Sequence, residues 1–287
     1  MERVKTFFQK THVGLWIFLF LQVIVLIQFA NGEQEVIFQL LVGYILSVLI
    51  SLTPIGEFCL CVFARAWGAP RSDMRERMEW LLEEIMNDVK EKSPGYAGKI
   101  QLRIINVDEP YVCALGRKTI AFSPNFLELP EDEQRGLLAS EVAHLVLRHN
   151  VWMMLAGCSN PLFLFMWLML QCTKLLFMVV GFIYCLFTRS NLHRFVSMAS
   201  VAITNLFVRL WTGLCMLFIY FENRQNVYVA DRYAADIGYG FELARGIDDL
   251  RDMHIQTGLL GSLFQSKPHP DARINSLIEY GVPYRGY

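Results

Sequence analysis

The sequence predicts an α+β membrane protein with four transmembrane helices and a mostly α-helical soluble part that contains a small, edge-exposed sheet. Hydrophobic residues make up 54% of the 287 residues and the mean hydropathy is +0.34, which is too apolar for an ordinary soluble domain. The apolar residues gather in long runs, whereas residues 71–150 have the composition of a soluble domain. The net charge of −1 gives no electrostatic reason to expect nucleic-acid binding.

The first 66 residues predict a transmembrane hairpin. Residues 13–30 and 36–56 are almost uninterrupted apolar runs, each long enough to cross a bilayer. Positive charges precede the first run and follow the second; they are Arg3, Lys5, Lys10, Arg65, Arg71, Arg75 and Arg77. Because cytoplasmic segments carry an excess of Lys and Arg, we expect both ends of this hairpin to face the cytoplasm.

Residues 67–150 predict the first part of the soluble domain. Apolar residues from Met74 to Val89 recur at helical spacing, and Ser93-Pro94-Gly95 should end that helix. Residues 99–106, 111–115 and 118–122 have the patterns of three strands. Pro130, followed by three acidic residues, should begin a second helix.

Residues 151–221 predict a second transmembrane hairpin, and residues 222–287 the second, largely helical part of the soluble domain. The apolar run 151–187 is broken at Asn160-Pro161 and contains Lys174, and a second run covers 199–221. The seven cysteines lie mostly in apolar stretches and form no C-x-x-C pair. We therefore expect them to be small buried hydrophobic residues and not disulfides or a zinc knuckle.

The segment from Ser140 to His144 in the second helix of the soluble domain resembles the H-E-x-x-H motif of zinc peptidases with its first histidine missing. In that motif the two histidines lie four residues apart, on one helical face, and bind one metal ion. The glutamate between them activates a metal-bound water. Here Glu141 and His144 are present, but Ser140 offers only a neutral hydroxyl. A carboxylate and an imidazole three residues apart can also simply pair on a helix.

Four segments, in order, resemble the HtpX-like family of membrane zinc metallopeptidases. They are residues 113–120 (CALGRKTI), residues 135–139 (RGLLA) leading into the degenerate motif, residues 223–231 (NRQNVYVAD) and residues 269–274 (HPDARI). The resemblance covers nearly the whole chain. It implies a zincin-like peptidase domain of the H-E-x-x-H type, whose two parts follow the first and the second transmembrane hairpin.

The resemblance also implies roles for individual residues. The first zinc histidine aligns with Ser140 and the third ligand, a glutamate, with Val227, which has no donor atom. His144 is the only expected ligand that remains, Glu141 is a vestigial general base, and Asp231 would orient a ligand. The family's substrate-binding edge strand aligns with Tyr111, Val112, Cys113, Ala114 and Leu115.

A catalytic zinc site normally has three protein ligands and a water molecule, so the sequence favours a pseudoprotease that binds no cofactor. An active zinc endopeptidase in membrane protein quality control would need substitute ligands, and a purely structural membrane component is a third possibility. Glu222 and His149 should each face away from the site on their helices. His254 and His269 could approach it in three dimensions, although His269 before Pro270 is more typical of a packed or capping residue.

The expected partners follow from this interpretation. We expect a multi-pass protein of a bacterial inner membrane, with its soluble domain in the cytoplasm. It would bind membrane-protein or unfolded peptide segments along the edge strand by β-augmentation, or regulate an active relative, and it could form a homo-oligomer.

Overall fold

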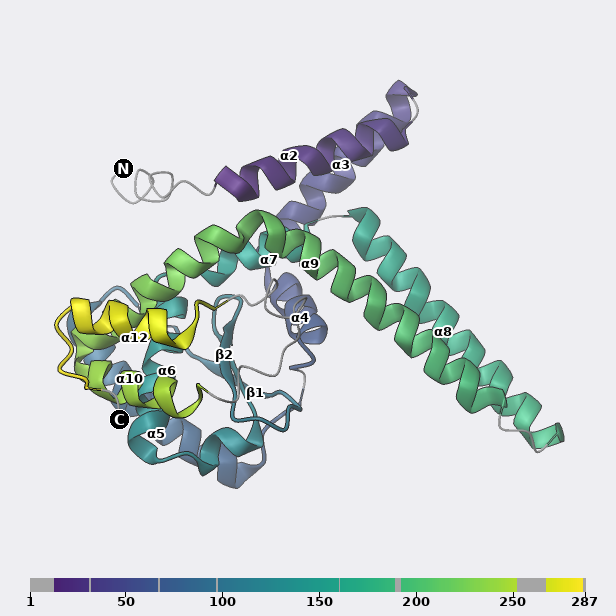
Figure 1. The fold of residues 1–287 in the computed structure, drawn as a ribbon. Helices are drawn as coiled ribbons and strands as arrows, with labels where there is room; N and C mark the ends of the chain where they lie inside the picture. Colours follow the sequence, from purple (N-terminus) through teal and green to yellow (C-terminus); the bar gives the residue numbers. More distant parts are fainter. Residues whose placement is uncertain are drawn as a thin grey trace. The chain divides into compact units, whose positions relative to one another are not determined.

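The computed structural model describes residues 13–30, 32–66, 68–96, 98–159, 161–188, 192–251 and 267–285. The chain forms two compact units. The first comprises the described residues of Leu52–Met154 and Ile219–Tyr287, and the second comprises those of Val13–Ser51 and Leu155–Phe218. Each unit is built from segments far apart in the sequence (Figure 1).

The second unit is entirely helical in its described residues. It contains α2 (Val13–Phe29), α3 (Gln34–Ser51), α8 (Pro161–Thr188) and the first part of α9 (Leu192–Ala234). The Tyr44 hydroxyl of α3 donates to the Leu19 carbonyl of α2 at 3.2 Å. Phe163 of α8 stacks on Trp211 of α9, with ring centroids 4.6 Å apart. These contacts hold apolar helices that expose many large hydrophobic side chains.

Two helical windows in this unit are long and apolar enough to cross a bilayer, namely Gln34–Ser51 and Phe165–Tyr184. Two further apolar helical stretches in the described part of the chain, Gly14–Gln28 and Met198–Trp211, have fewer than the 18 residues that this length criterion needs. The second predicted run, 36–56, ends earlier than expected. Thr53 caps a new helix, α4 (Pro54–Phe63), and Pro54 cannot donate the backbone hydrogen bond that would continue α3.

The first unit combines a sheet with helices. Its elements are α4, α5 (Ser72–Lys92), β1 (Gln101–Ile104), β2 (Val112–Leu115), β3 (Thr119–Phe122), η1 (Pro124–Glu128), α6 (Glu131–Val146), α7 (Asn150–Cys158), the end of α9, η2 (Ala235–Tyr239), α10 (Gly240–Asp249) and α12 (Pro270–Glu279). The three predicted strands and both predicted helices are confirmed, with shorter strands. One stripe of α5 is buried, as its spacing predicts: Met78, Leu81, Leu82, Ile85 and Val89.

The strand order is β1-β3-β2, with β1 parallel and β2 antiparallel to β3. β2 therefore has one edge that faces away from the other strands. Side chains from the sheet and four helices form the core, including Ile120 and Phe122 of β3, Leu138 and Val142 of α6, Leu243 of α10 and Leu277 of α12.

Helix α6 crosses α10 at very short range. A β-carbon added to Gly136 of α6 would lie 2.2 Å from the Leu243 backbone nitrogen. Gly246 of α10 lies opposite Leu137, whose Cγ would be 3.0 Å from an added β-carbon. The two glycines thus allow backbone-to-backbone packing, which fixes the helix that carries the degenerate motif.

Helix α9 is continuous from Leu192 to Ala234. The predicted apolar run 199–221 lies within this helix, and residues 222–234 extend it, which fits the helical character expected for the segment after residue 221. Val227 and Asp231 therefore lie near the C-terminal end of α9. The helical path bends at Gly238, whose φ of +101° is accessible mainly to glycine, before α10 begins.

Candidate active site

Ser140, Glu141 and His144 all lie on α6 and all are buried. The Ser140 hydroxyl donates to Asp231 Oδ1 of α9 at 2.8 Å. The same carboxylate accepts two bonds from Arg273 of α12, at 2.8 Å from Nε and 2.7 Å from Nη2. Ser140 therefore belongs to a buried polar network, and its hydroxyl proton is committed to Asp231.

Val227 lies one helical turn before Asp231 on α9, so the two side chains share a face. Only 2% of Val227 is exposed. The position at which the resemblance implies a third zinc ligand is therefore occupied by a buried isopropyl group.

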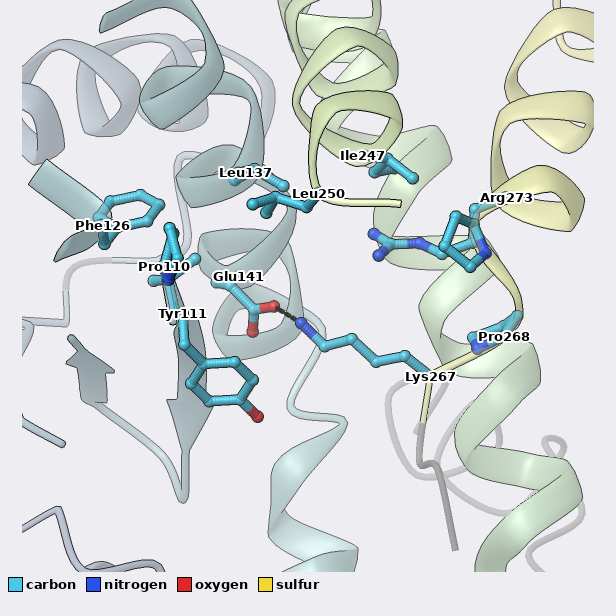
Figure 2. Close-up of a pocket in the computed structure, with 12 residues that line it drawn as sticks. Pro110, Tyr111, Phe126, Leu137, Glu141, Ile247, Leu250, Lys267, Pro268 and Arg273 are labelled. Atoms are coloured by element: carbon cyan, nitrogen blue, oxygen red, sulfur yellow. Dashed lines mark hydrogen bonds and ion pairs between the residues drawn. The ribbon is translucent and has the colours of Figure 1, made fainter. Parts of the chain in front are cut away.

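The Glu141 carboxylate is engaged on both oxygens. Its Oε2 accepts a hydrogen bond from the Ala114 backbone N–H at 2.8 Å, and its Oε1 pairs with Lys267 Nζ at 2.5 Å. The Lys267 ammonium also lies 5.9 Å from the centroid of the Tyr111 ring. Figure 2 shows the Lys267 side chain extended toward Glu141.

These contacts set the charge of Glu141. Burial raises its pKa, but Lys267, His144 and the Ala114 N–H outweigh burial and hold the pKa below its ordinary value. Burial lowers the pKa of His144, an effect that the nearby Glu141 carboxylate partly opposes. At neutral pH the site thus contains an ionised Glu141 beside a His144 that favours its neutral form.

Sequence reasoning did not identify Lys267 as a site residue. It lies 126 positions after Glu141, in the segment that precedes α12, and no periodic pattern links the two. The available signal was its place two residues before His269-Pro270, just ahead of the segment that carries the family resemblance.

The prediction that His149 faces away from the site is wrong. Helix α6 ends at Val146, and Arg148 adopts a left-handed conformation with φ of 58°. The His149 N–H then bonds to the His144 carbonyl and the Arg148 N–H to the Leu145 carbonyl, which is the Schellman pattern. Because this turn changes the direction of the backbone, His149 Nδ1 lies 3.2 Å from His144 Nδ1.

The other substitute ligands do not join the site within the described residues. His269 caps α12, where its Nδ1 accepts from the Asp271 N–H at 3.4 Å, and its side chain is mostly exposed. This agrees with the capping role expected for it. Glu222 lies within α9, but its side chain is outside the described part of the structure, as is the whole of His254.

The expected substrate-binding strand corresponds to β2 and Tyr111. The Ser123 N–H donates to the Tyr111 carbonyl, so by alternation the backbone groups of Val112 and Ala114 point away from β3. Both outward groups of Ala114 have partners within the chain: the N–H donates to Glu141, and the carbonyl accepts from Asn150 Nδ2 at 2.9 Å. The edge is therefore closed at Ala114.

A small pocket lies beside this edge. Glu141, Lys267 and Arg273 provide its polar wall, and Phe126, Leu137, Ile247 and Leu250 are among its apolar residues (Figure 2). Its volume of about 40 Å³ is enough for a few water molecules or a small apolar group.

The donor set does not fit a catalytic zinc ion. Among the residues that the structure describes, no three His, Cys, Asp or Glu side chains gather closely enough to hold a metal. His144 is a suitable ligand, but Ser140 is bonded to Asp231 and Val227 has no donor atom.

The comparison with protein families found a match. A model of peptidase family M48 matches residues 77–280, which is more than two thirds of the chain and includes α6, the site-bearing part of α9, and α12. No curated protein matches the chain.

Proposed function

The chain belongs to peptidase family M48, the family that contains the HtpX-like membrane zinc metallopeptidases, and we propose that it is a non-hydrolytic member. The observation that carries this proposal is the engagement of Glu141. A general base must accept a proton from a metal-bound water, yet both of its oxygens have partners within the chain, one of them the Lys267 ammonium. Ser140 and Val227 support the same conclusion, because neither supplies the missing ligands.

Metal analysis of the purified, detergent-solubilised protein, together with a peptidase assay on an unfolded substrate, tests the proposal. We expect far less than one zinc ion per chain. Any residual hydrolysis should be the same in the Glu141→Gln variant as in the wild-type protein. One zinc ion per chain, with chelator-sensitive cleavage lost in Glu141→Gln, would overturn it.

The function proposed for the retained fold is binding of an extended segment of a membrane protein or of an unfolded chain. The position of β2 at the edge of the sheet and the adjacent apolar pocket support this proposal. Because Ala114 is already bonded on its outward side, a docked strand would pair beside Val112 or displace Glu141 and Asn150. Fluorescence anisotropy with a labelled unfolded peptide tests this: saturable binding weakened by Val112→Pro supports it, and unchanged binding contradicts it.

The proposed topology has four membrane crossings with the peptidase-like unit in the cytoplasm. Two helical windows of sufficient length and the flanking positive charges support it, the latter including Arg65 and Arg71. Single cysteines placed at residues 33 and 99 in a cysteine-free variant would test it by labelling of intact cells. Residue 33 should react with an impermeant maleimide, and residue 99 only after lysis.

One observation favours a second candidate, an active zinc peptidase with a rearranged ligand set. His149 lies next to His144, and imidazole nitrogens are good zinc ligands. The metal analysis distinguishes the two candidates, because only the second expects zinc whose content falls on His149→Ala.

A further inference from the structure

The cleft contains a balanced set of charges without a metal ion. Two buried carboxylates, Glu141 and Asp231, face two cations, Lys267 and Arg273. A divalent cation placed here would therefore add charge that the surrounding side chains do not compensate, at high energetic cost in a buried site.

The two cations come from one short stretch of chain. Lys267 precedes α12 and Arg273 lies in its first turns, so the Lys267–Glu141 and Arg273–Asp231 pairs tie this stretch to α6 and α9 respectively. Lys267 is further confined by the face of the Tyr111 ring. The ammonium is thus paired with the carboxylate beside an aromatic ring, and only 27% of the Lys267 side chain is exposed.

We infer that Lys267 replaces the charge of the catalytic metal and is itself a barrier to metal binding. This inference rests on the proposed non-hydrolytic function and adds to it. Loss of the ligands at positions 140 and 227 is then only part of the reason that the site excludes zinc. Restoring those ligands alone should give a weak site, because the ammonium remains at Glu141.

Zinc titration of restored variants tests this, with isothermal calorimetry on the full-length protein in detergent. The first variant carries Ser140→His and Val227→Glu, and the second adds Lys267→Met. We expect the second to bind zinc about 100-fold more tightly, because a like charge a few ångströms away is removed from a weakly solvated site. Two control variants carry the restored ligands with a different third change. One has Lys267→Arg, which keeps the charge, and the other has Lys99→Met, which removes an exposed charge elsewhere; neither should bind zinc more tightly than the first variant.

Equal zinc affinity in the two restored variants, including binding by neither, would overturn the inference. Zinc already present in the wild-type protein would instead overturn the proposed function on which it rests.

A stability cycle provides a test that does not depend on the restored ligands. Lys267→Met should lower the melting temperature of the otherwise wild-type protein, because it leaves the buried Glu141 carboxylate without its cation. Adding Glu141→Gln to that variant should recover part of the loss. No recovery would show that Lys267 does not neutralise Glu141, and the inference would fail.

Discussion

The crossing of α6 and α10 gives a quantitative prediction about what positions the site. In Gly136→Ala the new β-carbon would lie 2.2 Å from the Leu243 nitrogen and 2.4 Å from the Glu242 carbonyl carbon, whereas ordinary contacts begin near 3.4 Å. The helices must separate by roughly 1 Å, because backbone atoms cannot rotate away as a side chain can. Overpacking costs about 1–3 kcal/mol and more in rigid places.

Alanine is the better helix former by about 1 kcal/mol, which offsets part of that cost. Because the clash is with backbone atoms, we expect a net loss near the upper limit of this difference, about 2 kcal/mol, and a fall in the melting temperature of about 4–8 °C in detergent. The change can be followed by circular dichroism.

Two matched glycine variants serve as controls for this prediction. Gly246→Ala meets the flexible Leu137 side chain at 3.0 Å and should lose less stability than Gly136→Ala. Gly43→Ala in α3 meets nothing within 4 Å and should be neutral or slightly stabilising. If the Gly136→Ala and Gly43→Ala variants had the same melting temperature, the close crossing of α6 and α10 would not exist in the protein and the prediction would be refuted.

Three further predictions concern charge and backbone conformation. Burial and the neighbouring Asp249 raise the pKa of Glu133 from 4.5 to about 7, so the folded state keeps a proton that the unfolded state loses. The stabilisation from this group is complete below about pH 4.5 and is lost as pH rises through 7. Glu133→Gln should therefore flatten the stability profile in that range, and a profile in chemical unfolding that keeps its slope would contradict the raised pKa. Arg273→Leu should cost about 3–5 kcal/mol, because it leaves buried Asp231 without its cation; a melting temperature equal to that of the parent would contradict the observed bidentate pair. Arg148→Gly should raise stability by about 0.5–1 kcal/mol in the same unfolding assay, since the left-handed conformation strains a residue with a β-carbon, and a loss would argue against that conformation.

Local patterns in the sequence predicted most of the elements of the peptidase-like unit. The spacing of apolar residues in α5 and the Pro130 start of α6 depend on interactions within a few residues, and both helices formed where expected. The three strands were likewise visible as short apolar patterns between turns.

The features that escaped prediction have no local signal. The Schellman turn usually has glycine at its left-handed position, but Arg148 occupies it here, so the turn that brings His149 beside His144 was not predicted. The pairing of Lys267 with Glu141 joins segments far apart in the chain and follows only from tertiary packing.

Each outer edge of the small sheet is bonded to the rest of the chain at one residue. The outer side of β1 pairs with Gly68, where the Ile104 N–H donates to the Gly68 carbonyl at 2.8 Å, and the outer side of β2 is bonded at Ala114 by side chains from α6 and α7. Unsatisfied strand edges are templates on which neighbouring chains stack into aggregates. Removing the Glu141 carboxylate would expose the Ala114 N–H on the edge of β2, and we expect such a variant to polymerise more readily.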